Sequence, residues 1–442
     1  MNGKIHLAFL ILLIAGCAAS PPNGSASYNF SYISEGIEER TDYTLRQASE
    51  PGQFEFPEWV TLDDGLSQDE AVALALWNNA QFQSDLAALG FARADLLEAN
   101  MLSNPIFSVL FPVSPKLLET ALDIPIDTLW QRPHRVAAAK FDAQKLSENL
   151  IENGLGLVRD VQIIYGDLLL AQERLILSTE EAQLQIQIAQ LDQARLRAGE
   201  ISELITTTSY MDTLRAADAV KRFSKEADIL EQRLDNLLGI NSDDIKFDIV
   251  PSEIALISNV SIDEILKTAF VARPDLRAAE LAIEAAGERI GWEKSKVFNL
   301  IAIIDAKDEG EDSLTVGPGF TVEIPFFNQN DGKIALAEAE LEQAARQYEA
   351  VRQDIILRVR QAHTRYVSAH EEFELWSNNI IPSLEQTVER TRKSFEAGEV
   401  SGLLVLEARQ TLVEARMRKA ELAANLHRSA AQLNYCIGKK MI

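Results

Sequence analysis

The sequence RAGEIS at Arg197–Ser202 returns about 200 positions later as EAGEVS at Glu396–Ser401, and this repeated turn decides how the chain is organised. In each copy the glycine follows a long helical pattern and precedes another one. A glycine that ends a helix in the left-handed conformation occupies this position. The two copies predict two long helical hairpins whose turns lie at the same end of a rod.

The repetition extends outward from the two turns in the same order. LSQDEA at residues 66–71 resembles VSIDEI at residues 260–265, and DIPI at residues 123–126 resembles EIPF at residues 323–326. Many matches in one order are typical of a duplicated structural unit. We therefore divide the body into a first structural repeat, a linker and a second structural repeat, at residues 61–240, 241–259 and 260–438.

The hydrophobic period is mostly helical in both repeats. It predicts helices over residues 67–101, 133–197 and 200–238 in the first repeat, and over residues 261–296, 331–396 and 399–438 in the second. Ser67 and Ser261 are each followed three residues later by glutamate, which predicts a capping box at two helix starts. The middle helix of each repeat would be roughly 95 Å long, which favours an antiparallel coiled-coil wall over an ordinary globular domain.

Between the first and second helices of each repeat, at about residues 104–126 and 297–326, the period changes from helix to strand. The second segment alternates apolar residues (Val316, Pro318, Phe320, Val322, Ile324 and Phe326) with small or polar ones. This pattern is typical of membrane β-barrel strands, with lipid outside and water inside. Asp123 and Glu323 hold corresponding positions on the predicted barrel interior, and the acidic run Asp305–Asp312 predicts a solvated loop.

Four strands per chain cannot close a transmembrane barrel, because the edge strands would remain unpaired. The chain would therefore have to oligomerise, and three copies would supply twelve strands around a water-filled lumen. The strand pattern alone also fits soluble hairpins packed on a helical core. A periplasmic coiled-coil lipoprotein that acts as a scaffold or spacer is therefore the alternative function.

The first residues read as a bacterial secretory signal. Lys4 provides a positive charge, Ile5–Ile14 an apolar stretch, and Ile14–Cys17 resembles a lipobox. We expect residues 1–16 to be a signal peptide, and Cys17 to carry lipid such as palmitate that holds the chain to a membrane. An uncleaved membrane helix is the alternative. Residues 17–60 have no clear period, which predicts an extended tether.

Composition argues against nucleic acids and catalysis. The chain has 442 residues and a formal charge of −25, which repels phosphate backbones. No nucleophile motif, phosphate loop or dinucleotide fingerprint occurs, and His363 and His370 are spaced too far apart on one helix to share an ion. We expect a transport protein that is not an enzyme, with no catalytic residues, cofactor or metal site.

Taken together, these residues resemble the TolC family of outer-membrane efflux proteins over about residues 60–440. The resemblance is carried by the two Ser-x-Asp-Glu helix starts, Asn104-Pro105, the strand ends at Pro125 and Pro325, and the paired turns. It implies a mainly α-helical chain with a small membrane β-barrel part. In a homotrimer, four strands per chain would form a twelve-stranded barrel, and the helices a periplasmic tunnel.

The resemblance also implies a function and partners. The chain would be the passive outer-membrane exit duct of a tripartite efflux or type I secretion system, lipid-anchored and extending into the periplasm. A periplasmic adaptor, or membrane fusion protein, and an inner-membrane transporter would complete the pump. The substrate stays open between drug, metal ion and protein, although an acidic lumen would favour cations.

Specific residues follow from the same resemblance. The adaptor would dock at the turns, where the implied residues are Gly199, Glu200, Ser202, Gly398, Glu399 and Ser401. The lumen gate would lie one turn further on, at Leu404 and Glu407. Aspartates are usual there, so Leu404 departs from the family's pattern and Glu407 alone could form an acidic ring. Residues 241–259 would belong to a belt around the middle of the tunnel.

Overall fold

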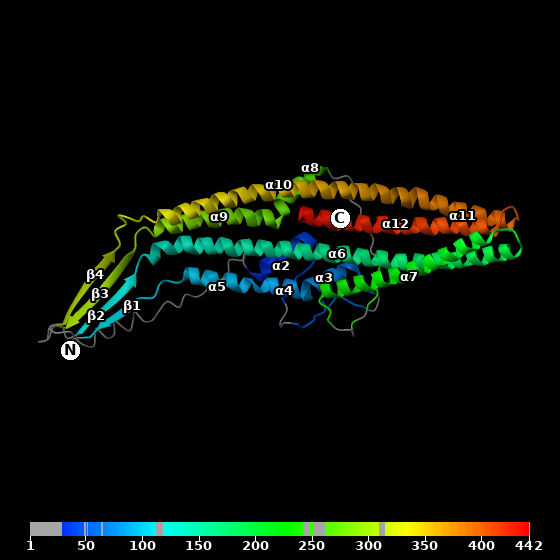
Figure 1. Ribbon diagram of the computed structural model, residues 1–442. Helices are drawn as coiled ribbons and strands as arrows, with labels where there is room; N and C mark the ends of the chain where they lie inside the picture. Colours follow the sequence, from blue (N-terminus) through cyan, green and yellow to red (C-terminus); the bar gives the residue numbers. More distant parts are fainter. Residues whose placement is uncertain are drawn as a thin grey trace. The chain divides into compact units, whose positions relative to one another are not determined.

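The structure is a computed structural model, and it describes residues 29–47, 50, 52–62, 65–111, 118–241, 245, 247–251, 261–308 and 314–441. It divides into two compact units. Unit 1 contains residues up to Ile33, Leu86–Leu150 and Pro274–Arg352, whereas unit 2 contains Ser34–Asp85, Ile151–Arg273 and Gln353–Ile442. Each sequence repeat contributes to both units, because its long helix passes from one unit into the other (Figure 1).

The first helix of each repeat is interrupted where the sequence predicts a continuous helix. Residues 67–101 form three helices, α3 (Gln68–Asn78), α4 (Ala80–Ala87) and α5 (Leu89–Asn100). Asn79 causes the first break, because its extended backbone ends α3 while its Oδ1 accepts the N–H of Phe82, 2.9 Å away, at the start of α4. The second repeat breaks at the corresponding Arg273, between α8 (Ile262–Ala272) and α9 (Pro274–Ser295).

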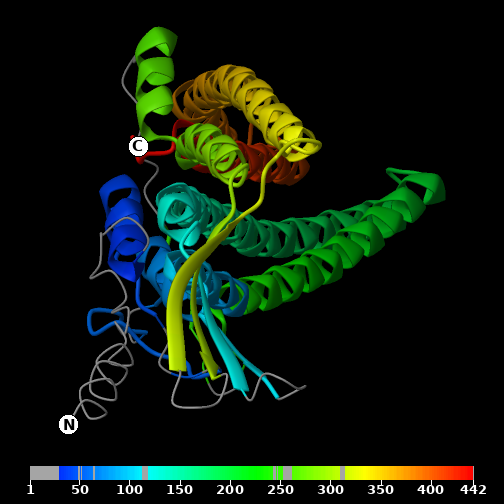
Figure 2. The ribbon, with the colours of Figure 1, turned by 90° about the vertical axis from the view of Figure 1, so that its left-hand side faces the viewer.

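The long helix of the first repeat is continuous. Helix α6 (Thr128–Arg197) has 70 residues and begins five residues before the predicted start, with Pro133 inside it. Helix α7 (Glu203–Leu238) follows the turn and runs back along the end of α6, as Figures 1 and 2 both show. The predicted ends of both helices at Gly199 and near Leu238 are confirmed.

The long helix of the second repeat is broken once, which the sequence did not predict. Helix α10 (Asp331–Leu375) passes into a five-residue π-helix (Trp376–Ile380) and then into α11 (Ile381–Glu396). Pro382, at the start of α11, has no N–H to donate, and such a missing hydrogen bond favours a local change in helix type. Helix α12 (Gly402–Ile437) completes the repeat.

Part of the predicted tether is folded. Helix α2 (Phe30–Thr41) lies within residues 17–60, so the expectation of an extended segment is wrong for this part. Its Arg40 Nε donates to the carbonyl oxygen of Ala272 at 2.9 Å, and the Lys440 N–H donates to the Arg40 carbonyl at 2.7 Å. The helix is held by contacts with residues far away in the sequence. Its local sequence pattern therefore could not predict it. The signal peptide and Cys17 lie outside the described residues.

Unit 1 carries one antiparallel sheet in the order β1-β2-β3-β4. The strands are β1 (Ile106–Leu110), β2 (Leu118–Pro125), β3 (Leu300–Asp308) and β4 (Leu314–Val322). Four strands in two hairpins match the prediction. Strand β3 extends through Asp305 to Asp308, so this part of the predicted acidic loop is strand, and the loop's remainder lies outside the described residues.

The linker predicted at residues 241–259 is described only in part. Its Ile249 forms a parallel bridge with Leu66, just before α3. The buried Tyr165 of α6 donates its hydroxyl to the Leu66 carbonyl at 2.8 Å and accepts the Val250 N–H at 3.1 Å. One hydroxyl on the long helix therefore ties both strand-like segments of unit 2 to its core.

A helix that crosses a membrane must be both long enough and apolar enough. No helix within the described ranges satisfies both conditions.

Glycines at two helix ends provide a stability test. Gly239 and Gly199 have similar positive φ values of 74° and 78°. An added Cβ at Gly239 would lie 2.2 Å from the Asn78 carbonyl oxygen, whereas no heavy atom of the described residues lies within 4 Å of one at Gly199. We expect Gly239→Ala to lower the free energy of unfolding by more than ~3 kcal/mol, and Gly199→Ala by only ~1 kcal/mol.

Denaturant unfolding followed by circular dichroism measures both values. Equal losses in the two variants would show that the tight contact with Asn78 does not contribute.

Candidate functional site

The sheet has two chemically different faces, because residues paired across antiparallel strands share a face. The register places Phe107 opposite Leu122, Leu122 opposite Ile304, and Ile304 opposite Pro318. We call this side the apolar face. It carries Phe107, Val109, Leu118, Thr120, Leu122, Ile124, Leu300, Ala302, Ile304, Ala306, Asp308, Val316, Pro318, Phe320 and Val322.

Several large side chains of the apolar face are left mostly exposed by the described residues. Phe320 is 73% exposed, Phe107 65% and Val316 60%. An apolar surface of this extent on a soluble monomer would be unusual. The alternation predicted from the sequence is therefore present in the sheet, with one side suited to an apolar environment.

The opposite side, which we call the polar face, carries most of the ionisable groups of the sheet. Lys307 Nζ lies 3.0 Å from Asp305 Oδ2 and 3.5 Å from Glu119 Oε1. Asp123 shares this face, since it pairs with Ile303 of β3. The face thus holds three carboxylates and one lysine. Sequence reasoning missed Asp305 and Lys307, because they were assigned to a loop instead of a strand.

Glu323 does not lie in a strand, although it was predicted to correspond to Asp123. Strand β4 ends at Val322, and the Glu323 N–H donates to the Asn299 carbonyl at 3.2 Å. Asn299 Nδ2 in turn donates to Glu323 Oε2 at 2.9 Å. The carboxylate therefore sits at the helix-side end of the sheet. Its role as an interior residue, like that of Asp123, stays a prediction.

The two turns in unit 2 have the same backbone. The Gly199 N–H donates to Leu196 O and the Glu200 N–H to Arg195 O, both at 2.9 Å. The Gly398 and Glu399 N–H groups make equivalent bonds to Phe395 and Ser394, also at 2.9 Å. Both glycines have φ of 78°, so each turn is a Schellman motif that only glycine enters without strain.

Side chains below the turns differ between the repeats. In the first hairpin, Asp192 is buried and accepts the hydroxyl of Ser209 from the neighbouring helix. Arg195 Nη1 lies 3.5 Å from Asp192 Oδ1, and Arg195 Nε lies 3.5 Å from Glu200 Oε2. This brace joins α6, α7 and the turn. The positions that correspond to Asp192, Arg195 and Ser209 in the second hairpin are Thr391, Ser394 and Ala408, which cannot form this ion pair or this hydrogen bond.

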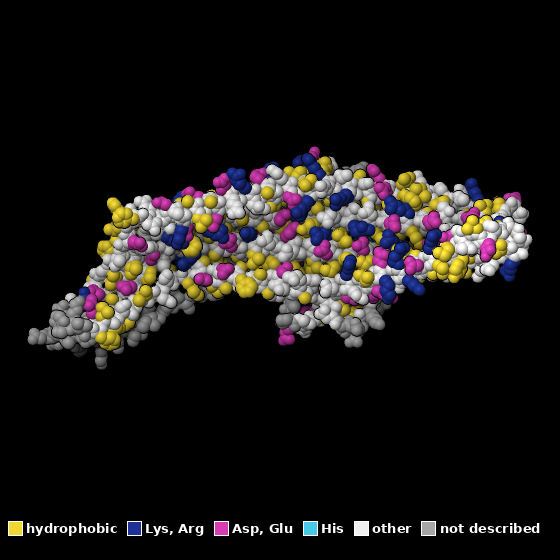
Figure 3. Space-filling view, in the orientation of Figure 1, with side chains coloured by type: hydrophobic (Ala, Val, Ile, Leu, Met, Phe, Trp, Pro, Cys, Tyr) yellow, Lys and Arg dark blue, Asp and Glu magenta, His cyan; other side chains and the backbone are white. Residues whose placement is uncertain are grey.

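The predicted docking and gate residues are accessible. Gly199, Glu200, Ser202, Gly398, Glu399 and Ser401 are all exposed. Leu404, in the first turn of α12, is 44% exposed, and Glu407 is exposed one turn later. Figure 3 shows hydrophobic side chains near the turn of α6 and α7, where Leu204 is 75% exposed. The structure brings these residues to the hairpin ends without assigning their roles.

Behind the turns, the helices of unit 2 are joined by packing and by charge. Leu177 and Leu184 of α6 form a buried cluster with Val413 of α12. Arg174 bridges two further helices, with Glu226 of α7 at 3.4 Å and Glu421 of α12 at 2.9 Å. Burial acts to raise the pKa of Glu421, but hydrogen bonds from Arg174 and Arg418 outweigh it and lower this pKa. Arg174 thus holds the two hairpins together.

Within the described parts of the chain, no group of three or more His, Cys, Asp or Glu side chains is arranged to hold an ion. His134 instead pairs with Glu288 at 2.7 Å, between α6 and α9 of unit 1.

The chain is similar in sequence to known outer-membrane efflux proteins. Residues 265–439 match the family model of the outer membrane efflux proteins. The cobalt-zinc-cadmium resistance protein CzcC of Cupriavidus metallidurans is 23% identical over 386 residues, which cover 85% of this chain and 90% of CzcC. The cation efflux system protein CusC of Escherichia coli K12 is 27% identical over 161 residues, or 34% of this chain and 35% of CusC.

Solved structures show the same fold. A crystal structure of CusC superposes with a TM-score of 0.67 at 20% identity, over 89% of this chain and 98% of that one. The CmeC outer membrane channel of Campylobacter jejuni gives 0.68 at 16% identity, over 87% and 89%. The predicted resemblance and the mainly helical fold are thereby confirmed. The fold is that of outer-membrane efflux channels.

The hydrogen bond between Ser209 and Asp192 should stabilise the first turn. Ser209→Ala would leave the buried Asp192 carboxylate without its hydroxyl donor, which costs ~1–3 kcal/mol. We expect faster amide hydrogen exchange at residues 195–205. Thr208→Ala is the matched control, because that exposed hydroxyl only donates to the Leu204 carbonyl of its own helix, at 3.0 Å. Equal exchange rates in the two variants would show that the hydrogen bond between Ser209 and Asp192 does not stabilise the turn.

Proposed function

We propose that this chain is an outer-membrane efflux protein, and that three copies of it form a lipid-anchored exit duct that carries metal cations out of the periplasm. The apolar face of the sheet is the observation that carries the proposal. Phe107, Val316 and Phe320 need an apolar environment, and the other side of the same sheet carries ionic groups. Lipid on one side and water on the other satisfy both requirements.

Strand pairing gives the reason for an assembly. Within the described residues, β1 pairs only with β2 and β4 only with β3, so one edge of each outer strand has no partner in its own chain. Unpaired N–H and C=O groups are costly in lipid, and pairing of β4 with β1 of the next copy would remove every free edge. Three copies would close twelve strands, consistent with the two sequence repeats at residues 61–240 and 260–438.

Cys17 would anchor the mature chain by lipid, after removal of residues 1–16. An adaptor protein and an inner-membrane transporter would complete the pump, with the adaptor contacting the exposed turns at Gly199 and Gly398. Leu404 and Glu407 would surround the lumen near that end. Residues 241–259 would join the repeats in a belt around the tunnel.

The cargo is proposed from the relatives and from charge. CzcC, CusC and the probable outer membrane lipoprotein SilC of Salmonella typhimurium are all similar, and two of their names state cobalt-zinc-cadmium resistance and cation efflux. The polar face offers Glu119, Asp123 and Asp305 against Lys307 alone. A net negative lining in each copy would favour cations over anions.

Membrane insertion is tested with two neighbouring positions. Phe320→Lys would put a charge on the apolar face, which costs ~2–4 kcal/mol at the middle of a bilayer. Thr321→Lys, one residue along β4, would put the same charge on the polar face. We expect heat-modifiable trimers and single-channel conductance for Thr321→Lys and their loss for Phe320→Lys. If both variants formed trimers but neither showed conductance, a periplasmic scaffold would be favoured instead.

The cargo is tested in cells that lack the protein. We expect them to become several-fold more sensitive to zinc, cobalt or cadmium. Wild type and Thr321→Lys should restore resistance, whereas Phe320→Lys should not. Growth inhibition across a metal concentration series measures the effect, with an uncharged drug as the comparison. Sensitivity to the drug alone would contradict metal cargo while leaving the duct intact.

A further inference from the structure

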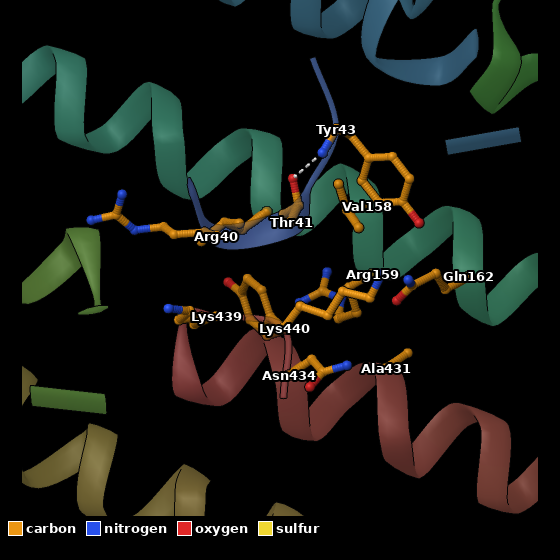
Figure 4. Close-up of a pocket in the computed structure, with 12 residues that line it drawn as sticks. Arg40, Thr41, Tyr43, Val158, Arg159, Gln162, Ala431, Asn434, Lys439 and Lys440 are labelled. Atoms are coloured by element: carbon orange, nitrogen blue, oxygen red, sulfur yellow. Dashed lines mark hydrogen bonds between the residues drawn. The ribbon is translucent and has the colours of Figure 1, made fainter. Parts of the chain in front are cut away.

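One pocket of unit 2 is lined by basic residues from three separate segments (Figure 4). Helix α2 and the residues after it supply Arg40, Thr41 and Tyr43. Helix α6 supplies Leu155, Val158, Arg159 and Gln162, and the end of α12 with the following residues supplies Ala431, Asn434, Tyr435, Lys439 and Lys440. The empty space, including the open mouth, is about 340 Å³.

The charge of this pocket is opposite to that of the protein. The chain has 67 Asp and Glu residues against 42 Lys and Arg, yet the described residues that line the pocket include four cations and no carboxylate. A neighbouring hollow shares Arg40 and Lys439 and adds Lys267, with Glu39 as its one acid. Positive charge is therefore concentrated where α2, α8 and the end of α12 meet.

Two of the four cations are neutralised by carboxylates next to the pocket. Arg159 Nη2 lies 2.7 Å from Asp160 Oδ1, and Lys440 Nζ lies 3.5 Å from Asp42 Oδ2. Arg40, in contrast, donates to backbone carbonyls, from Nε to Ala272 at 2.9 Å and from Nη1 to Gly36 at 2.8 Å. Lys439 is exposed and has no ion pair among the described residues. The charges of Arg40 and Lys439 are therefore uncompensated.

Uncharged polar groups complete the lining. The Met441 N–H donates to Asn434 Oδ1 at 2.9 Å, which leaves the Asn434 Nδ2 group as a donor. Burial raises the pKa of Tyr435 to about 12, and its hydrogen bond to the Glu152 carboxylate acts in the same direction, so its hydroxyl stays uncharged at neutral pH. The Arg159 guanidinium stacks over the Tyr435 ring, 4.2 Å from its centre, and this contact holds the arginine at the pocket.

We propose that this pocket binds one anionic group, a carboxylate or a phosphate, carried by a molecule of the periplasm. Uncompensated cations repel each other at short range, and an anion between them converts that repulsion into attraction. The ligand would connect α2, α6 and the segment after α12, which are far apart in sequence. Its binding should therefore stabilise the folded chain.

The test titrates the full-length protein with inorganic phosphate and, separately, with acetate. Sodium chloride keeps the ionic strength constant, because general screening must not be mistaken for binding. We expect a saturable heat signal in isothermal titration calorimetry, and a matching rise in the thermal midpoint. Saturation by phosphate alone would assign a phosphate-bearing ligand, and saturation by acetate alone a carboxylate-bearing ligand; both support the site.

The variant Lys439→Gln/Lys440→Gln removes two pocket cations while it leaves the helices intact. We expect its affinity for the bound anion to fall at least about tenfold, or ~1.4 kcal/mol. Lys145→Gln/Lys221→Gln makes the same change of charge on α6 and α7 outside the pocket, and should bind like wild type. Equal affinity of the pocket variant and wild type, or no saturation by either anion in wild type, would overturn the proposal.

Discussion

The unpaired edges of the sheet are the constraint on which the rest of the molecule depends. Strands β1 and β4 each use one side for pairing within the described chain, and the sheet between them is apolar on one face and ionic on the other. In an isolated copy the apolar face would be exposed to water, and the outer edges of β1 and β4 would lack hydrogen-bond partners. A second structural repeat supplies two of the four strands, so the duplication of the sequence doubles the arc that one copy can contribute.

The sequence predicted the features that local chemistry determines. Ser67 forms the expected capping box with Glu70, and Gly239 and Gly438 end α7 and α12 in the left-handed conformation. The alternation along residues 316–322 gave the correct faces of β4, because strand period and register follow from the side chains themselves. These signals lie within a few residues of one another and need no knowledge of the tertiary structure.

Features that depend on distant contacts were not predictable. Helix α2 is held by Ala272 and Lys440, and the Asp192 brace needs Ser209 from the opposite helix. The two turns read almost identically in sequence and share one backbone, yet only the first has this support beneath it. Likewise, the Lys307 pairs became visible only when β3 was seen to continue beyond Asp305. The two repeats therefore share the backbone geometry of their turns but not the side-chain interactions beneath them.

The π-helix at Trp376–Ile380 changes the rotational phase of the long rod in the second repeat. Before it, buried residues follow a regular heptad spacing: Ile355, Val359, Ala362, Tyr366 and Ala369. Continued at that spacing, the stripe would reach position 380, but the next buried residue is Ile381. One additional residue in a turn rotates every later side chain by roughly 100° about the axis. The additional residue therefore brings Ile381 to the azimuth that position 380 would have had, so the rod keeps the same side buried along α10 and α11.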